Sequence, residues 1–315
     1  MNNRIMRKRI LCYKNNEIRV FWSDCKKMLA SLEDNSVSLI ITSPPYCMGK
    51  EYENISDDID SFIKLNSMVI KESTRILKKG GSLCWQVGFH VKNSAIVPLD
   101  CLIYNIVQKI NAHLSNDDKL VLHNRIIWTF GHGLNSEKRL SGRYETIMWF
   151  TKGNDYVFNL DPIRVPQKYP GKKYSRGKRI GEFSGNPLGK NPSDVWDIPN
   201  VKANHVEKTN HPCQFPIVIP QKLIKALTNE HDLVVDPFLG SGTTAIACII
   251  EDRRFIGSEL KKEYINISDD RIKRALNGDI DYRPDDPPME PNVNQKVAQK
   301  PESFLWQNKK EENQN

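Results

Sequence analysis

The sequence predicts an α/β fold with a doubly wound, mostly parallel sheet. Short β-branched or aromatic runs alternate with stretches in which apolar residues recur at helical spacing. Two of these runs end in turns of unusual composition, one with two consecutive prolines and one with two glycines separated by a single residue. Alternating strands and helices are typical of parallel sheets, whose ligands bind beyond the carboxyl ends of the strands. We therefore expect both turns at the same edge of one sheet.

The first half of the chain supplies strands and helices in regular order. We expect a strand over 18–23, a helix over 25–32, a strand over 37–41, a helix over 60–77 and a strand over 82–87. Asp24 stands where the first of these strands ends. The helix over 60–77 is expected to stop at Lys78-Lys-Gly-Gly81, because two glycines disfavour a helix interior.

The second half returns to the same alternation after a long irregular stretch. We expect strands over 125–130 and 144–150, a helix over 220–228, a strand over 233–235, a helix over 245–251 and a strand over 254–258. Between about 152 and 210, Gly, Pro, Asn and Lys dominate and no periodic pattern survives. We therefore divide the chain into an α/β domain in two halves, 1–151 and 211–278, an insertion over 152–210, and a poorly ordered tail over 279–315.

Composition restricts the classes of protein. Lys and Arg together number 46 against 38 for Asp and Glu, which favours a polyanionic partner. No apolar run approaches the roughly 18 residues of a membrane-spanning helix, and no apolar stretch follows the basic start. We expect a cytoplasmic protein without membrane contact. The 7 cysteines are scattered and form no Cys-x-x-Cys pair, so we expect no disulfide framework and no metal site.

Residues 233–259 have the order of a cofactor-binding unit: strand, glycine turn, helix, second strand and acidic residue. Gly240 and Gly242 permit a tight turn and a close backbone approach, and the N–H groups of the following helix favour an anion. Asp236 ends the first strand. Glu259 ends the second, where an acid suits the hydroxyl groups of a ribose. The alternative is a tight strand–helix turn with solvated acids.

Two other nucleotide motifs are excluded by the same segment. A P-loop would carry a lysine directly after its last glycine, but Thr243 follows Gly242. The dinucleotide pattern Gly-x-Gly-x-x-Gly fails because Ala245 stands at the third glycine position. A nicotinamide-dependent oxidoreductase is therefore disfavoured.

Thr42-Ser-Pro-Pro-Tyr46 is the candidate catalytic loop. Its prolines, Pro44 and Pro45, have no N–H, so the groups left to face a ligand are acceptors, the Ser43 hydroxyl and the Pro44 carbonyl. Two acceptors that hold the hydrogens of an exocyclic amino group would leave its lone pair available for attack. The ring of Tyr46 can stack on a base rotated out of a duplex. The alternative is an edge turn with a packed tyrosine.

Taken together, Thr42-Ser-Pro-Pro-Tyr46 and Asp236-Pro-Phe-Leu-Gly-Ser-Gly-Thr-Thr244 resemble the amino-methyltransferases of bacterial restriction–modification systems. The catalytic motif precedes the cofactor motif, an order similar to the beta group of that family. The resemblance covers residues 18–275. It implies the S-adenosylmethionine-dependent methyltransferase fold, S-adenosylmethionine as cofactor and double-stranded DNA as substrate.

The resemblance also implies the roles of particular residues. Asp24 would contact the adenine of the cofactor and Glu259 its ribose, although Ser23 stands where the family often has glycine. Asn210–Pro216 is similar to the segment that closes over the methionine part, but Cys213 and Phe215 replace the usual Thr and Lys. The remaining cofactor contacts would come from Asp236, Phe238, Gly240, Gly242 and Thr243.

The serine of the catalytic loop bears on the target base. In the resembling family, Ser before Pro-Pro-Tyr is typical of cytosine-N4 enzymes, whereas Asp or Asn is typical of adenine-N6 enzymes. We therefore predict a site-specific cytosine-N4 DNA methyltransferase, with an adenine-N6 enzyme as the alternative and a non-catalytic DNA-binding protein as the remote one. A cognate restriction endonuclease acting on the same site is a further candidate partner, and the sequence leaves monomer and homodimer open.

Between Arg164 and Lys190 the sequence carries eight basic residues, and the only acid is Glu182. Phosphate contacts from such a segment would give salt-dependent affinity for DNA. In the resembling family the target-recognition region likewise lies between the catalytic and cofactor halves. The alternative is a solvated flexible loop. The predicted DNA-binding residues are Lys168, Lys172, Lys173, Arg176, Lys178 and Arg179.

Two further methyltransferase classes are disfavoured by motif order. Pro212-Cys-Gln214 is similar to the nucleophile segment of cytosine-C5 enzymes, but there the cofactor motif comes first. Protein glutamine methyltransferases also place it first, and they would leave the basic insertion unexplained. RNA as substrate stays open.

Overall fold

The computed structural model describes residues 7–13, 16–46, 59–92, 95–131, 133, 135–166, 173–182, 186, 188–202 and 204–283. The strands in it are β1 (Arg7–Tyr13), β2 (Asn16–Trp22), β3 (Val37–Thr42), β4 (Leu77–Val87), β5 (Phe89–Lys92), β6 (Ala95–Pro98), β7 (Leu120–Thr129), β8 (Tyr144–Lys152), β9 (Val195–Asp197), β10 (Leu233–Asp236) and β11 (Arg254–Glu259). The helices are α1 (Cys25–Ala30), α2 (Ile59–Ile76), α3 (Leu99–Asn111), α4 (Val218–Leu227), α5 (Thr243–Ile250) and α6 (Lys262–Leu276), with the 3₁₀ turn η1 (Asp161–Ile163).

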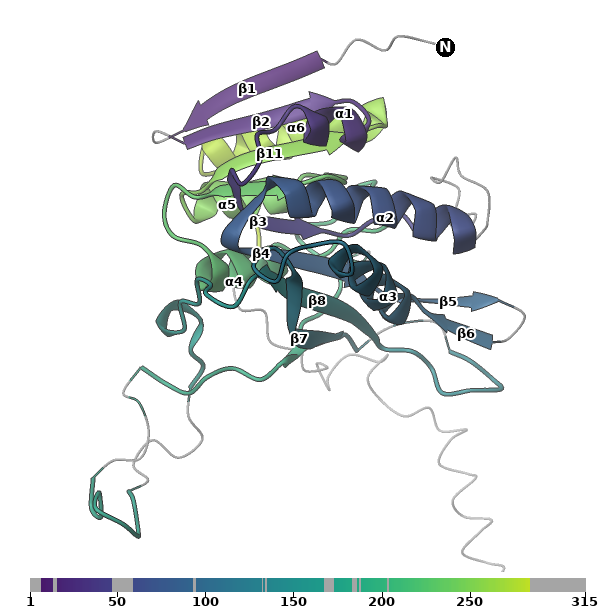
Figure 1. Ribbon diagram of the computed structural model, residues 1–315. Coiled ribbons are helices and arrows are strands. Elements are labelled where there is room, and N and C mark those ends of the chain that lie inside the picture. Colours follow the sequence, from purple (N-terminus) through teal and green to yellow (C-terminus); the bar gives the residue numbers. More distant parts are fainter. Residues whose placement is uncertain are drawn as a thin grey trace, which may run out of the picture.

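Nine of the described strands form one central sheet, in the order β1-β2-β11-β10-β3-β4-β8-β7-β9 (Figure 1). The five strands from β2 to β4 are parallel to one another. β8 runs antiparallel to both β4 and β7, and β1 runs antiparallel to β2. The sheet is therefore mostly parallel at its centre, which confirms the predicted fold class.

Helices cover both faces of the sheet (Figure 1). Apolar residues of α1, α2 and α3 pack in one buried cluster, whereas those of α4, α5 and α6 pack in a second. β3 lies between them and is buried at every position. Its Leu39 and Ile41 belong to one cluster and its Ile40 to the other, because successive side chains of a strand point to opposite faces.

The second helix ends at Ile76, next to its predicted end, but the strand after it begins earlier than predicted. Lys78–Gly81 does not lie between helix and strand but belongs to β4, which begins at Leu77. The pairing with β3 passes from Val37↔Leu77 to Leu39↔Ser82, so the residues between form a bulge. Gly80 has φ +74°, a conformation that glycine adopts without strain, and this explains how two glycines fit inside a strand.

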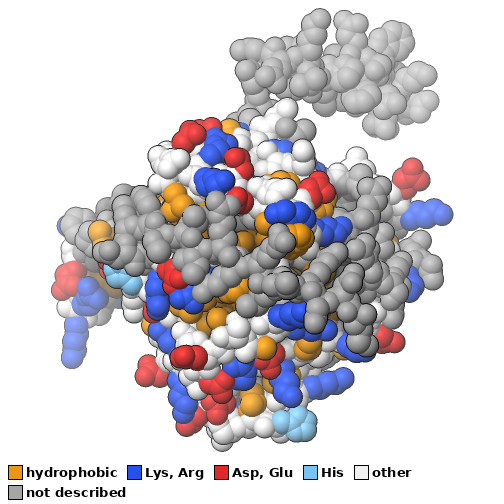
Figure 2. Space-filling view, turned by 90° about the horizontal axis from the view of Figure 1, so that it is seen from above, with side chains coloured by type: hydrophobic (Ala, Val, Ile, Leu, Met, Phe, Trp, Pro, Cys, Tyr) orange, Lys and Arg blue, Asp and Glu red, His pale blue; other side chains and the backbone are white. Residues whose placement is uncertain are grey.

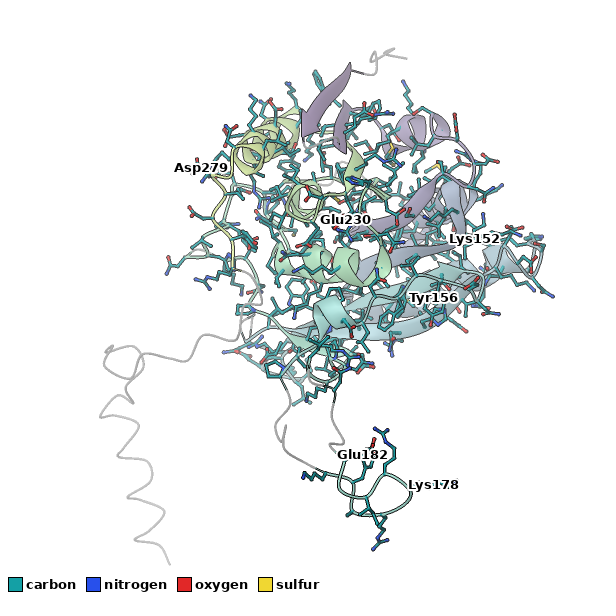
Figure 3. All side chains as sticks on the ribbon, turned by 90° about the vertical axis from the view of Figure 1, so that its left-hand side faces the viewer. Lys152, Tyr156, Lys178, Glu182, Glu230 and Asp279 are labelled. Atoms are coloured by element: carbon teal, nitrogen blue, oxygen red, sulfur yellow. The ribbon has the colours of Figure 1, made fainter. Side chains whose placement is uncertain are left out.

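The insertion is less irregular than its composition indicates. β9, in the last part of the insertion, joins the sheet as an edge strand parallel to β7. The segment 173–182, by contrast, stands away from the body of the molecule, as Lys178 and Glu182 show (Figures 1 and 3). The helices α3 and α6 were not predicted from the sequence. Most of the predicted tail, from residue 284 onward, lies outside the described residues.

Candidate active site

The proline turn and the glycine turn meet at one edge of the sheet. β3 and β10 are parallel neighbours, with Val235 opposite Ile40, so both strands end at the same edge. The Thr42 hydroxyl at the end of β3 donates to Asp236 Oδ1 at the end of β10, over 2.7 Å. A cavity of about 930 Å³ opens there and is lined by residues of both turns, among them Ser43 and Gly240. The shared cleft expected from the sequence is therefore present.

Asp236 lies behind the cavity wall rather than in it. Its side chain is 1% exposed, and it is not among the residues that line the cavity. Besides the Thr42 hydroxyl, the Thr244 hydroxyl and the Phe238 N–H donate to its carboxylate, over 2.7 and 3.0 Å. Burial raises the pKa of Asp236 to about 6. Three protein donors therefore occupy the carboxylate, which suits a positioning role, and the contact of Asp236 with the cofactor stays a prediction.

The two glycines of the cofactor turn have different surroundings. Gly240 lines the cavity with φ +54°. Gly242 has φ +83° and precedes α5, and a Cβ there would come within 2.9 Å of the Ser268 side chain on α6. Gly242 therefore permits close packing of α5 against α6; it does not line the cavity, and its contact with the cofactor stays a prediction. Phe238 and Thr243 line the cavity as expected.

Two acidic residues predicted to hold the cofactor both line the cavity. Glu259, at the end of β11, accepts from the Gly240 N–H at 3.1 Å and from the Lys261 N–H at 2.7 Å. Burial raises the pKa of Glu259. Asp24 caps α1, where its Oδ1 accepts from the Lys26 N–H at 2.8 Å. These acids come from neighbouring strands, because β2 is parallel to β11.

Ser43, Pro44, Pro45 and Tyr46 all line the cavity. The Tyr46 hydroxyl accepts from the Gly88 N–H at 2.7 Å, which holds the ring against the end of β4. A second hollow of about 190 Å³ adjoins the cavity and shares Tyr46, Phe130 and Glu145 with it. The tyrosine ring therefore lies at the junction of the two spaces.

β7 and β8 contribute side chains to the cavity that were not predicted as site residues. Trp128 and Phe130 line the cavity, with ring centroids 5.3 Å apart in an edge-to-face arrangement. Glu145, the second residue of β8, also lines it, and the Gln86 amide donates to its carboxylate. Both segments had been predicted as strands. The sequence did not show where these strands lie in the sheet, because β8 pairs antiparallel with β4, from which a long stretch of chain separates it.

The segment that the resemblance placed over the methionine part does border the cavity, with Cys213 and Phe215 both in the lining. The His211 ring packs edge-on to Tyr264, with centroids 4.4 Å apart, and lies against Gly240, where a Cβ would be 3.1 Å from Nε2. Burial lowers the pKa of His211 to about 4, so the ring is neutral at physiological pH. The neutral ring of His211 therefore covers one side of the glycine turn.

Those predicted DNA-binding residues that the structure describes lie apart from this cavity. Lys173, Arg176, Lys178 and Arg179 are exposed, and Arg179 pairs with Glu182 over 2.8 Å. In Figure 1 their segment is at the lower left, whereas the β5–β6 hairpin, which follows the carboxyl end of β4, is at the right. Lys168 and Lys172 lie outside the described residues. The lysines that do line the cavity are Lys26, Lys202, Lys208 and Lys261.

On the face that Figure 2 displays, the visible basic and acidic side chains are mixed. None of the helices in the described part of the chain has the length and apolar character that a bilayer crossing needs. Within the same residues, no group of three or more His, Cys, Asp or Glu could hold a metal ion.

Comparison with known proteins identifies the family. Residues 37–270 match the family described as DNA methylase, whose name gives the N6 and N4 amino positions. The type II methyltransferase M.BglII of Bacillus subtilis is 43% identical over 251 residues, which cover 79% of this chain and 67% of the relative. The solved structure of the cytosine-N4-specific PvuII DNA methyltransferase has the same fold, with a TM-score of 0.62 at 21% identity. The match covers 82% of this chain and 92% of that chain. TTHA0409 of Thermus thermophilus, whose structure was solved in complex with S-adenosyl-L-methionine, gives a TM-score of 0.55 at 25% identity, and the match covers 81% of this chain and 95% of that chain.

Proposed function

Since the chain belongs to this family of DNA methylases, we propose that it transfers a methyl group from S-adenosylmethionine to the exocyclic amino group of cytosine in double-stranded DNA. The observation that carries the proposal is the shared cavity, in which the acceptor loop 43–46 faces the glycine turn at 240. An amino group held at one turn can thus be brought to a methyl donor held at the other.

The residues of the cavity fit S-adenosylmethionine. Asp24 and Glu259 supply carboxylates at two neighbouring strand ends, which suits the adenine amino group and the ribose hydroxyls. Gly240 leaves the turn without a side chain, and a Cβ there would press on His211. Phe238, Leu239 and Phe215 add apolar surface. The bound cofactor supplies an electrophilic methyl group on a sulfonium.

The acceptor loop would hold the target amino group. The Ser43 hydroxyl and the Pro44 carbonyl can each accept one of its hydrogens, which favours a nitrogen with an available lone pair. The Tyr46 ring, fixed by its hydrogen bond to the Gly88 N–H, would stack on the base. No nucleophilic side chain is needed, because the amino nitrogen itself attacks.

Ser43 also supports cytosine over adenine. Its hydroxyl is short and uncharged, as in the cytosine-N4 enzymes that the motif resembles, whereas adenine-N6 enzymes carry Asp or Asn there. An adenine-N6 enzyme is the alternative. Methylation of a short sequence protects it from cleavage, so a cognate endonuclease is the partner that this activity would serve.

Incubation of the purified chain with plasmid DNA and S-adenosylmethionine, followed by nucleoside mass spectrometry, tests the proposal. We expect N4-methylcytosine, and N6-methyladenine would establish the alternative. Ser43→Ala should reduce the product strongly, whereas Ser115→Ala, on an exposed loop away from the cavity, should not. Cofactor binding without methylation of either base would refute the proposed function.

A further inference from the structure

Leu140 is the most exposed large hydrophobic side chain among the described residues. It is 93% exposed, whereas the next most exposed, Ile180 and Leu188, are at 66% and 63%. Leu140 lies in the β7–β8 loop, residues 130–143, of which 132 and 134 are outside the described residues. Single exposed apolar side chains are common on protein surfaces, so the exposure of Leu140 gains meaning only from the residues around it.

The loop that carries Leu140 is braced by its own hydrogen bonds. The Phe130 N–H donates to the Arg143 carbonyl at 3.0 Å and closes the base of the loop. Nearer the tip, the Ser136 N–H donates to the Ser141 hydroxyl at 3.0 Å, and the Arg139 guanidinium donates to the Leu140 carbonyl at 3.3 Å. The structure thus presents Leu140 on a short supported turn.

The loop packs beside the smaller hollow next to Tyr46. Gly142, two residues after Leu140, lines that hollow, and a Cβ there would come within 2.2 Å of the Phe89 ring on β5. The guanidinium carbon of Arg139 lies 5.9 Å from the centre of the same ring. Leu140 therefore lies between Arg139 and Gly142 in the chain, and both of these lie near the ring of Phe89, which lines the hollow that Tyr46 also lines.

The charge around Leu140 suits DNA. Between 135 and 143 the loop carries Lys138, Arg139 and Arg143, against the single acid Glu137. Basic side chains on each side of an apolar tip can contact the phosphates that flank one base step. The loop that carries this cluster reaches the smaller hollow through Gly142, whereas the basic segment 173–182 stands away from the body of the molecule (Figure 1).

We propose that Leu140 enters the DNA stack at the target site and fills the space that the target base leaves when it rotates into the cavity. The proposal rests on the proposed function, because it assumes that a base must reach Ser43. Rotation of a base breaks its pairing and its stacking on both sides, and an apolar side chain that occupies the gap offsets part of that cost. Arg139 and Arg143 would hold the neighbouring phosphates.

The test compares two substrates. Once the methylated sequence is mapped on plasmid DNA, one duplex carries it intact and a second carries an abasic position opposite the target base. With Leu140→Ala we expect kcat/KM on the intact duplex to fall about tenfold or more. On the abasic duplex, whose target base is already unpaired, the loss should shrink to within about twofold. An equal loss on both duplexes, or no loss on either, would overturn the proposal.

Two variants serve as controls. Leu140→Met keeps an apolar tip and should retain near wild-type rates on both duplexes. Ile96→Ala removes an aliphatic side chain that is 51% exposed on β6 and should leave both rates unchanged. S-adenosylmethionine affinity measured by calorimetry should be the same in every variant, because Leu140 does not line the main cavity. If the wild-type chain methylates no plasmid DNA, the proposed function fails. If the wild type does methylate it and Leu140→Ala has the same rates, only the role proposed for Leu140 fails.

Discussion

Thr42 and Asp236 are 194 residues apart in the chain, yet the hydroxyl of one donates to the carboxylate of the other over 2.7 Å. Thr42 immediately precedes the acceptor loop, and Asp236 immediately precedes the glycine turn. The bond therefore ties together the two strand ends whose following turns line the cavity. It fixes the distance between the group that would hold the base and the group that would hold the methyl donor.

Thr42→Val should harm catalysis more than cofactor binding. The substitution keeps the shape of the side chain but leaves Asp236 with one donor fewer, which should lower the free energy of unfolding by about 1–3 kcal/mol. Because this hydrogen bond joins the two turns, we expect kcat to fall while the calorimetric affinity for S-adenosylmethionine changes little. Thr244→Val removes another donor to Asp236 without touching the acceptor loop. If both variants lose stability equally and Thr42→Val keeps wild-type kcat, the positioning role is wrong.

Asp236 should make the folded protein less stable as the pH rises from about 4 to 6. An unfolded aspartate titrates near pH 3.9, whereas burial raises the pKa in the folded state to about 6. Between these values the folded state binds more protons, so the contribution of Asp236 to stability is greatest below pH 4 and is lost as its carboxylate ionises. The difference amounts to roughly 3 kcal/mol.

Asp236→Asn isolates this effect from the other titrating groups. The amide stays uncharged, so urea unfolding should show the variant gaining stability relative to the wild type as the pH rises from 4 to 7. A constant difference in the free energy of unfolding across that range would show that Asp236 does not titrate there.

Gly240→Ala should weaken S-adenosylmethionine binding about tenfold, which corresponds to ~1.4 kcal/mol. At φ +54° an alanine is strained by roughly 1–2 kcal/mol, and its Cβ would displace the His211 ring that lies 3.1 Å away. Gly278→Ala is the matched control, because Gly278 has φ +73° with nothing within 4 Å. Calorimetry should find the control affinity unchanged despite a similar loss of stability. Equal affinities in the two variants would contradict the assigned contact.

The basic segment of the insertion should affect DNA binding through charge alone. Replacement of Lys173, Arg176 and Lys178 by Ala should reduce the slope of log K against log salt by about 0.9 for each phosphate that the variant no longer neutralises. Methylation at saturating DNA should be unchanged, because the segment lies apart from the cavity. Replacement of the exposed lysines Lys64, Lys71 and Lys109 on α2 and α3 is the control. An unchanged slope in the insertion variant would refute the predicted contacts.

The sequence by itself determined the local features of this protein. The strand before each turn, the acceptor character of Ser43-Pro-Pro and the need for glycine at 240 follow from backbone chemistry, which depends on neighbours in the chain. The alternation of elements then predicted a parallel sheet with both turns at its carboxyl edge. The family resemblance, carried by the same two motifs, was confirmed by comparison.

Only the tertiary structure decided which side chains face the cavity and which support it from behind. Asp236 turns inward because Thr42 and Thr244 supply hydroxyl donors from two other elements, and Gly242 packs against α6 instead of facing the cavity. Glu145 reaches the cavity because β8 lies beside β4, and the 173–182 segment lies apart from it. Each of these outcomes depends on contacts between residues far apart in the chain, and short-range sequence patterns do not predict such contacts.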